Sequence, residues 1–223
     1  MTGAVLSTIE YGSPNGFPVV ALHGAAGMKE RWKRAGTEGM PQRRWICPDL
    51  RGYGESIKSP PWTLAQLAQD VVATLDSLRV ETADLIGASL GGAVAFAVAR
   101  LAPSRVRSVV VVDPPVSTRE EYLSRGFVAP ETVAAFGKST SENLPPTLGE
   151  FAGDVLLLES GRSHMVTESG RAALRSQLGT RLHAVTFDDA GHMLLLEAFD
   201  RTVSEIEQFL GDVGQDARAK GSR

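Results

Sequence analysis

The sequence is poor in the residues that stabilise disulfide-bonded, metal-dependent and membrane-spanning proteins. It contains a single cysteine, Cys47, which excludes an intramolecular disulfide and a cysteine-rich metal site. Four scattered histidines add no ligand cluster of the usual spacing, so no metal is predicted. No apolar run approaches the roughly 20 residues that a transmembrane helix needs, and no membrane partner is expected.

Charge is not concentrated anywhere along the chain either. The formal net charge is −3 and the two signs are interspersed, which leaves no basic patch for nucleic acid. The first stretch, "MTGAVLSTIEYGSPNG", has neither a basic region nor a long apolar run, so it does not resemble a signal peptide. The 223 residues, 43% of them hydrophobic, suffice for a real core. We therefore expect a cytoplasmic globular protein.

What the sequence does contain is a series of short apolar runs that alternate with helical patterns. The runs are continuously apolar, as expected of parallel strands that helices cover on both faces. Turn-forming residues bound them, and each has the length of a strand. They are residues 17–24, 43–50, 82–89, 107–115, 154–160 and 182–187. The predicted fold class is α/β, with a mostly parallel central sheet and helices on both faces.

Helical patterns occupy residues 63–79, 90–102 and 198–210. The first opens with Thr63 and has Gln66 three residues later, the signature of a capping box. The last is expected to end before the glycine at 211.

One interval, residues 116–150, contains no strand-like run and is predicted to form a short helical cap. The cap would interrupt a core made of residues 1–115 and 151–212. Residues 213–223 are polar and aperiodic, which predicts a flexible tail.

The stretch "LIGASLGG" carries the pattern G-x-S-x-G, with Ser89 at its centre. Glycines at 87 and 91 let a strand and the following helix pack closely, which forces the serine into a strained turn with its hydroxyl exposed. The helix start behind it directs free N–H groups at the same place. Because the motif lies between an apolar strand and an apolar helix, we predict that Ser89 is a nucleophile; the alternative is a simple strand–helix turn.

A serine hydroxyl needs a base to accept its proton. His192 lies in a loop after the last predicted strand, and the order serine, acid, histidine selects it among the four histidines. His183 lies within a strand-like run and is expected at the surface. His23 ends the first parallel strand and is expected to brace its loop.

The negative oxygen of a tetrahedral intermediate needs hydrogen-bond donors. The glycine-rich turn "HGAAG" would supply the N–H of Ala25, and the residue after the nucleophile would supply the N–H of Leu90. Several large side chains either line an acyl or alcohol pocket or belong to the core, and the sequence leaves both readings open. These are Met28, Trp32, Trp62, Phe127 and Met193.

Five stretches together resemble the α/β-hydrolase superfamily. "ALHGAAG", "CPDLRGYGES", "LIGASLGG", "VVVVDPP" and "DDAGHMLLLEAFD" occur in its order and at its spacing, over residues 4–210. The resemblance implies a central sheet, a Ser–acid–His triad on loops at the carboxyl ends of the strands, and a cap after the family's sixth strand. It implies no cofactor. The short N-terminal part predicts that one of the family's two leading antiparallel strands is missing.

The same resemblance raises the question of the acid. The family commonly places it after its seventh strand, where this chain has Ser163 in "ESGRS". A subset carries the acid after the sixth strand and shows a G-x-x-S loop after the seventh, which "SGRS" resembles. That subset points to Asp113 in "VVVVDPP". Glu159 is the alternative, and an aspartate before two prolines is also an ordinary turn residue.

These residues predict a serine hydrolase that cleaves a carboxylic ester, lactone or related acyl bond of a small-molecule substrate through an acyl-enzyme. Ser89 would attack, His192 would carry the proton, and Asp113 would orient the imidazole. The alternatives are a lyase or cofactor-free oxygenase on the same triad, and a receptor that binds a ligand without catalysis. The short cap predicts an open, lightly covered site.

Overall fold

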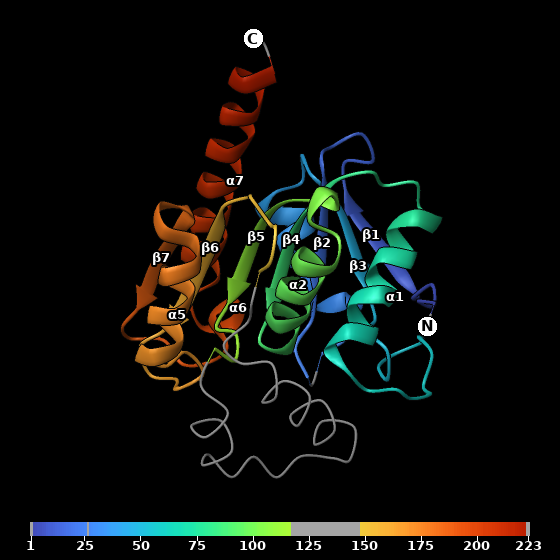
Figure 1. Cartoon of the computed structure of the whole chain (residues 1–223), viewed down its shortest axis with the longest axis horizontal. Coiled ribbons are helices and arrows are strands. Elements are labelled where there is room, and N and C mark those ends of the chain that lie inside the picture. Colours follow the sequence, from blue (N-terminus) through green and yellow to red (C-terminus); the bar gives the residue numbers. More distant parts are fainter. Residues whose placement is uncertain (1, 26, 117–147, 222–223) are drawn as a thin grey trace.

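The computed structural model describes residues 2–25, 27–116 and 148–221, and it contains a seven-stranded sheet in the order β1-β3-β2-β4-β5-β6-β7 (Figure 1). The strands are β1 (Thr8–Gly12), β2 (Pro18–Leu22), β3 (Arg44–Pro48), β4 (Ala83–Ala88), β5 (Val106–Val112), β6 (Val155–Ser160) and β7 (Leu182–Phe187). The helices are α1 (Leu64–Ser77), α2 (Leu90–Leu101), α5 (Glu168–Leu178), α6 (Leu194–Glu197) and α7 (Phe199–Gly221). Four single turns, η1 (Lys29–Trp32), η2 (Ala35–Gly39), η3 (Pro103–Arg105) and η4 (Gly179–Arg181), complete the described elements.

The sheet is parallel except at one edge. β1 pairs antiparallel with β3, and every other pair is parallel. The predicted mostly parallel sheet is therefore confirmed, and one antiparallel strand leads it within the described residues. The chain runs from β2 to β3 on one side and then returns to β4 on the other, so the carboxyl ends of β2 and β4 flank a switch point. Ligands of open α/β sheets bind at such a point.

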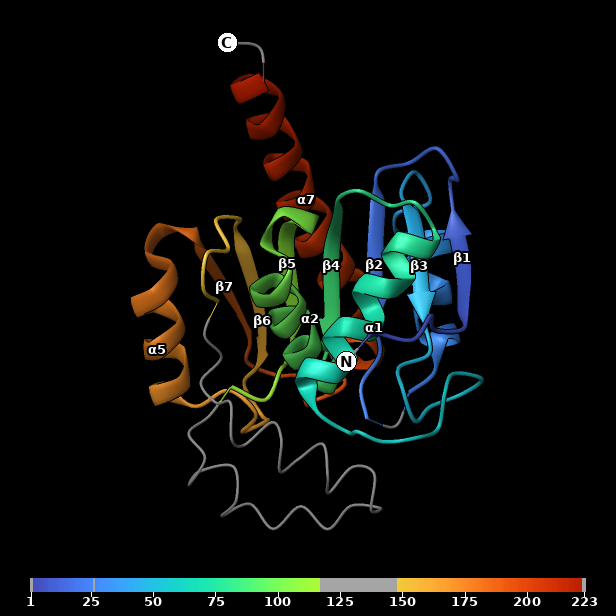
Figure 2. The same cartoon turned by 45° about the vertical axis from the view of Figure 1, so that its right-hand side comes forward.

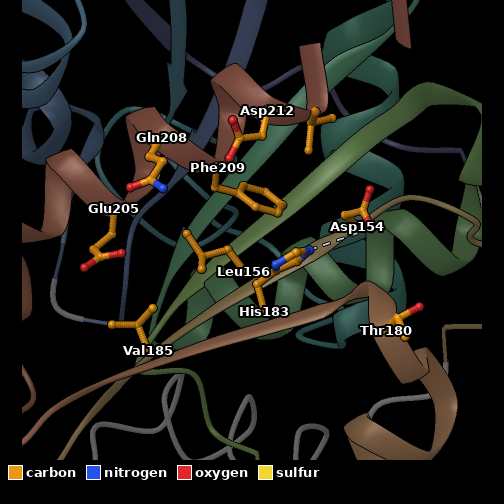
Figure 3. Close-up of a pocket in the computed structure, with 10 residues that line it drawn as sticks. Asp154, Leu156, Thr180, His183, Val185, Glu205, Gln208, Phe209 and Asp212 are labelled. Carbon is orange, nitrogen blue, oxygen red and sulfur yellow. Dashed lines mark ion pairs between the residues drawn. The ribbon is translucent and has the colours of Figure 1, made fainter. Parts of the chain in front are cut away.

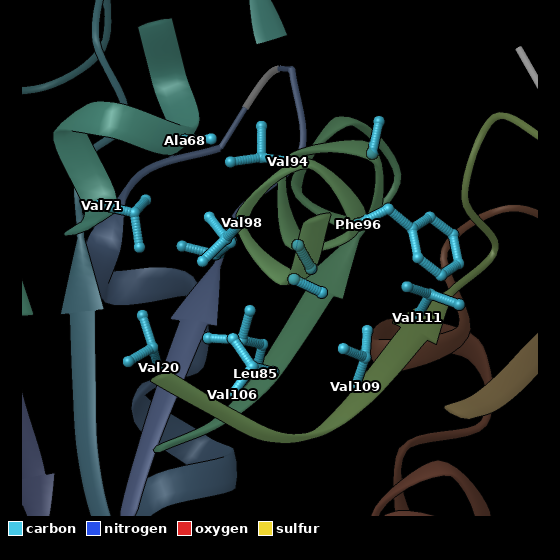
Figure 4. Close-up of a cluster of buried hydrophobic side chains, with 14 of the residues drawn as sticks. Val20, Ala68, Val71, Leu85, Val94, Phe96, Val98, Val106, Val109 and Val111 are labelled. Atoms are coloured by element: carbon cyan, nitrogen blue, oxygen red, sulfur yellow. The ribbon is translucent and has the colours of Figure 1, made fainter. Parts of the chain in front are cut away.

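Helices cover both faces of the sheet. Figures 1 and 2 show α1, α2 and α5 on one face, and α6 and α7 on the other. Each interface is an apolar core. On the first face, valines of β5 meet valines of α2, and Leu85 of β4 lies among them (Figure 4). β-branched side chains suit a strand surface, and burying each contributes about 1.5–3 kcal/mol.

Two details of the helices differ from the sequence-based expectation. The Thr63 side chain caps α1 by accepting the Gln66 N–H at 3.2 Å. The reciprocal half of a capping box, from the Thr63 N–H to the Gln66 side chain, is not seen among the described residues; the buried Gln66 amide nitrogen donates to Asp70 at 3.0 Å. At the other end of the chain, α7 continues past Gly211 to Gly221, where we expected an irregular tail. No proline interrupts residues 211–221, and a glycine alone costs a helix only about 1 kcal/mol.

The predicted cap, residues 116–150, lies almost wholly outside the described residues. Within the described ranges, no helix is both long and apolar enough to cross a membrane.

A buried ion pair ties the loop after β3 to helix α1. The Arg51 guanidinium meets the Asp70 carboxylate with both arms, at 2.6 and 2.9 Å, and both side chains are almost fully buried. Arg51 also donates to the Ser59 carbonyl at 2.8 Å, and Asp70 accepts the Ala4 N–H at 2.8 Å. The hydrogen bonds to the Asp70 carboxylate raise the pKa of Arg51. This pair anchors the loop that runs beside the switch point.

We predict that Arg51→Met lowers the free energy of unfolding by about 3–5 kcal/mol, because it leaves the Asp70 carboxylate buried without its counter-charge. Urea denaturation of the purified variant measures the loss. The control is Arg34→Met, which removes exposed ion pairs with Glu38 and Asp200 and should cost at most about 1 kcal/mol. Equal losses in the two variants would contradict the prediction.

Candidate active site

Ser89 occupies the single residue between β4 and α2. Its backbone has φ 50° and ψ −119°, a region that L-residues rarely adopt, as predicted for the elbow. Glycines make the turn possible: a Cβ on Gly87 would lie 2.2 Å from the Gly91 carbonyl oxygen, and one on Gly91 would lie 2.1 Å from the Leu22 carbonyl oxygen. The Ser89 N–H donates to the Val112 carbonyl at 2.9 Å. The serine is therefore held by the backbones of three neighbouring segments.

Asp113 and His192 meet at the same edge of the sheet. The His192 Nδ1 lies 2.6 Å from the Asp113 Oδ2. Asp113 directly follows β5, is fully buried and has φ 44°. His192 arrives on the loop between β7 and α6, and about a third of its side chain is exposed. The structure thus brings together two of the predicted site residues that lie 79 positions apart in the sequence.

Glu159, the alternative acid, points to a different partner. It is nearly buried, and Arg171 of α5 binds its carboxylate at 2.7 and 3.1 Å. The Thr186 hydroxyl donates to the same carboxylate at 3.0 Å. Asp189, which precedes His192 by three positions in the sequence, is fully exposed, and its carboxylate lies 3.6 Å from the Arg162 guanidinium. Among the described acids, Asp113 alone forms an ion pair with His192.

The predicted oxyanion turn follows β2 and lies against Ser89. A Cβ on Gly24 would lie 3.2 Å from the Ser89 Cβ, a tight contact that the glycine avoids. The turn closes with a 3.0 Å bond from the Gly27 N–H to the Gly24 carbonyl, and Ala25 lies within it. Leu90 is the first residue of α2, where backbone N–H groups have no partner inside the helix.

His23 braces this turn, as the sequence predicted. It is fully buried, and its Nε2 accepts the Leu50 N–H at 3.0 Å. The proton therefore lies on Nδ1, which donates to the Gly24 carbonyl at 2.8 Å. With both ring nitrogens engaged, His23 links the turn after β2 to the loop after β3.

The buried carboxylate of Asp49 also links the turn after β2 to the loop after β3. It accepts the N–H groups of Lys29 at 2.8 Å and Glu55 at 2.9 Å, and the Lys29 ammonium lies 3.3 Å away. Burial opposes the charge on Asp49, but these donors outweigh it and hold the pKa below its ordinary value. Ser56 is also buried, and its hydroxyl donates to the Asp49 carbonyl at 2.6 Å. The short turn folds its hydroxyl back onto the chain.

The large side chains considered for a pocket lie in different environments. Trp32 is fully buried and stacks near Trp45, with ring centroids 6.1 Å apart, so it belongs to the core and not to a pocket. Met28 and Met193 are 55% and 42% exposed, on the loops that carry the oxyanion turn and the histidine. Trp62 is half-buried against Gly52, at the fringe of the α1 core. Phe127 lies outside the described residues.

No group of three or more metal-ligating side chains gathers in the part of the chain that the structure describes. Cys47 is buried in β3, and burial raises the pKa of its thiol, as expected of a core cysteine. A hollow of about 370 Å³ opens between β7 and α7 (Figure 3). His183, half-exposed as predicted, packs there on Phe209 and lies 4.0 Å from Asp154. The hollow lies by the amino end of β6, whereas Asp113 lies by its carboxyl end.

The comparisons with known proteins agree with this architecture. Residues 18–136, more than half of the chain, match the family described as alpha/beta hydrolase fold. The chain belongs to this family. Its fold is also similar to that of a thermophilic esterase from Thermogutta terrifontis, with a TM-score of 0.78, 25% identity and 93% of both chains covered.

Curated relatives share only part of their length with this chain. It is 40% identical over 131 residues to a dihydrolipoyllysine-residue acetyltransferase component of an acetoin cleaving system from Pseudomonas putida, covering 57% of this chain and 35% of the relative. It is 37% identical over 117 residues to a 2-hydroxymuconate semialdehyde hydrolase from Pseudomonas sp. (strain CF600), covering 49% and 40%. The chain thus spans well under half the length of these relatives.

The buried imidazole of His23 predicts a pH dependence of stability. Burial lowers the pKa of His23 in the folded protein, whereas an unfolded histidine titrates near 6.5. Below about pH 6.5 the unfolded chain therefore binds a proton that the folded protein does not, and stability falls as the pH falls, by at most about 1.4 kcal/mol per pH unit.

Urea denaturation between pH 8 and pH 5 measures this slope. We expect His23→Gln to be less stable at pH 8 but to show a shallower slope than the wild-type protein. His164→Gln, which changes an exposed histidine, is the control and should keep the wild-type slope. A His23→Gln slope equal to that of the wild type would contradict the prediction.

Proposed function

We propose that this chain is a serine hydrolase that cleaves a carboxylic ester, lactone or related acyl bond of a small molecule through an acyl-enzyme. The observation that carries the proposal is the 2.6 Å contact between His192 Nδ1 and the buried Asp113 carboxylate. It lies at the sheet edge where Ser89 occupies a strained elbow. A nucleophile elbow, a histidine and an acid at one edge are the parts that acyl transfer requires.

In this proposal each ring nitrogen of His192 has its own task. Because Nδ1 faces Asp113, the other nitrogen, Nε2, is left to accept the Ser89 proton. Ser89 Oγ then attacks the carbonyl carbon, and the N–H groups of Ala25 and Leu90 receive the negative oxygen. His192 returns the proton to the leaving alcohol. Water then takes the place of the alcohol: His192 accepts its proton, its oxygen attacks the acyl carbon, and the carboxylic acid product leaves as Ser89 regains its proton.

Asp113 is the acid in this proposal. A carboxylate can orient the imidazole and stabilise its protonated form only when it is close to the ring. Glu159 has its charge neutralised by Arg171 at 2.7 Å. The names of the relatives, an esterase and a hydrolase among them, support a hydrolytic reaction. A lyase or oxygenase that uses the same residues, and a receptor that uses none, are the competing outcomes of the experiments below.

The first experiment tests the nucleophile. Ser89→Ala should abolish the burst of p-nitrophenol from p-nitrophenyl acetate and the covalent labelling by a fluorophosphonate, because no hydroxyl remains to be acylated. Mass spectrometry of the labelled protein locates the adduct. Ser77→Ala, an exposed serine at the end of α1, is the control and should keep both signals. A burst that persists in Ser89→Ala would contradict the assignment of Ser89 as the nucleophile.

The second experiment distinguishes the two candidate acids. Asp113→Asn should lower turnover by about 10⁴-fold, the cost of the equivalent change in the serine-protease template, because the amide favours the wrong imidazole tautomer. Glu159→Gln is the matched variant on the next strand and should stay within about tenfold of wild type. If Glu159→Gln is inactive while Asp113→Asn is not, Glu159 is the acid.

A further inference from the structure

Lys29 follows the turn that carries Ala25, and only 8% of its side chain is exposed. A lysine is rarely buried unless its charge has a partner, so this ammonium is held in place by its surroundings. We propose that Lys29 is a positioning residue that fixes the turn between Gly24 and Gly27 and thereby keeps the Ala25 N–H where the oxyanion forms. The proposal rests on the proposed function, because the Ala25 N–H acts there as an oxyanion donor.

The Lys29 ammonium joins the chain before β1 to the loop after β3. It donates to the Ser7 hydroxyl at 2.8 Å and lies 3.3 Å from the Asp49 Oδ2. The Glu55 carboxylate binds it as well. An ammonium has three N–H donors, and here it meets an oxygen from each of these three residues. The side chain therefore has one defined position, and the start of η1 is fixed with it.

The backbone of Lys29 is held by the same carboxylate as its side chain. The Lys29 N–H donates to the Asp49 Oδ1 at 2.8 Å, while the ammonium faces Oδ2. At the other end of the turn, His23 donates to the Gly24 carbonyl at 2.8 Å and accepts the Leu50 N–H at 3.0 Å. The two ends of the turn are thus anchored to adjacent residues of one loop, and Lys29 provides the second anchor.

Lys29 is also the only cation that pairs with Asp49 in the part of the chain that the structure describes. Asp49 is buried, so loss of the ammonium would leave its carboxylate with two backbone N–H donors and no opposite charge. A buried charge without a partner is costly, and we expect the loop and the turn to shift to relieve it. A displacement of about 1 Å at a group that acts on the reacting atoms can cost about 100-fold in rate.

The test uses three substitutions of Lys29 and a matched control. Lys29→Met removes the ammonium and keeps most of the apolar stem. Lys29→Gln also removes the charge but keeps a donor, and it replaces the methionine variant if that variant does not fold. Lys29→Arg keeps a cation. The control is Arg107→Met, which removes a cation from another buried carboxylate, Asp84, near the amino ends of β4 and β5.

We expect Lys29→Met to lower kcat/KM for p-nitrophenyl acetate at least about tenfold, in the range that a lost or displaced oxyanion donor costs. Lys29→Gln should lower it as well, and Lys29→Arg should recover most of it. Arg107→Met should lower the melting temperature, as Lys29→Met does, but leave kcat/KM unchanged. A loss below about twofold in the neutral variants that fold, less than a displaced donor costs, would overturn the proposal. An arginine variant no more active than the neutral ones would also overturn it.

A second substrate separates an effect on the oxyanion from a general loss of activity. The thionoester of p-nitrophenyl acetate carries sulfur in place of the carbonyl oxygen, and sulfur accepts hydrogen bonds weakly. Well-placed oxyanion donors therefore favour the ester over the thionoester, and displaced donors favour it less. We expect the ratio of the two kcat/KM values to fall in the neutral Lys29 variants. It should stay at the wild-type value in Arg107→Met, and also in Asp113→Asn, because the histidine acts on both substrates alike.

The ratio also identifies the kind of failure. If the neutral Lys29 variants lose activity on both substrates by the same factor, the ratio is unchanged and the positioning role is refuted, while the proposed function stands. A wild-type protein that hydrolyses neither substrate would refute the proposed function and this proposal with it.

Discussion

The close approach of three backbones at the start of α2 determines where everything else in the site must lie. The helix begins at the residue after Ser89, and at Gly91 it passes so near β2 that a single Cβ would collide with the Leu22 carbonyl. A helix this close leaves only one residue for the turn, and that residue must take a positive φ. Gly24 allows a similar close approach, because without a side chain the turn after β2 can lie against Ser89. Ser89 is thus placed by the absence of side chains on the glycines around it.

Buried acids in this protein are supported in two different ways. Asp70 and Glu159 are each matched by an arginine, Arg51 and Arg171 respectively. Among the described residues, Asp113 is matched only by neutral donors and by His192. An arginine beside Asp113 would neutralise its carboxylate whether or not the imidazole carried a proton. The attraction between the carboxylate and a protonated His192 would then be weaker. Neutral donors satisfy the carboxylate oxygens without adding an opposite charge beside them.

Much of this arrangement follows from the sequence, and the exceptions have physical reasons. Continuous apolar runs predicted the six parallel strands, and small residues around Ser89 predicted the elbow. The sequence alone did not decide between Asp113 and Glu159, because the decisive fact is the arginine on α5, twelve residues away. That helix itself was not predicted, since it buries few apolar side chains, Leu174 and Leu178 among them. The sequence left Trp32 open between a pocket and the core, because a large apolar side chain suits either place, and the structure buries it completely.

Ser89 and Asp113 follow two strands that pair in one ladder, with Ala88 opposite Val112. The distance between Ser89 and Asp113 is therefore set by strand register and does not depend on the conformation of a long loop. The residues between Asp113 and β6 lie outside this ladder, so their number can change without altering that distance. Relatives of this chain can thus differ in what connects β5 to β6 and still inherit the same spacing of Ser89 and Asp113, because the hydrogen bonds of a single strand pair fix it.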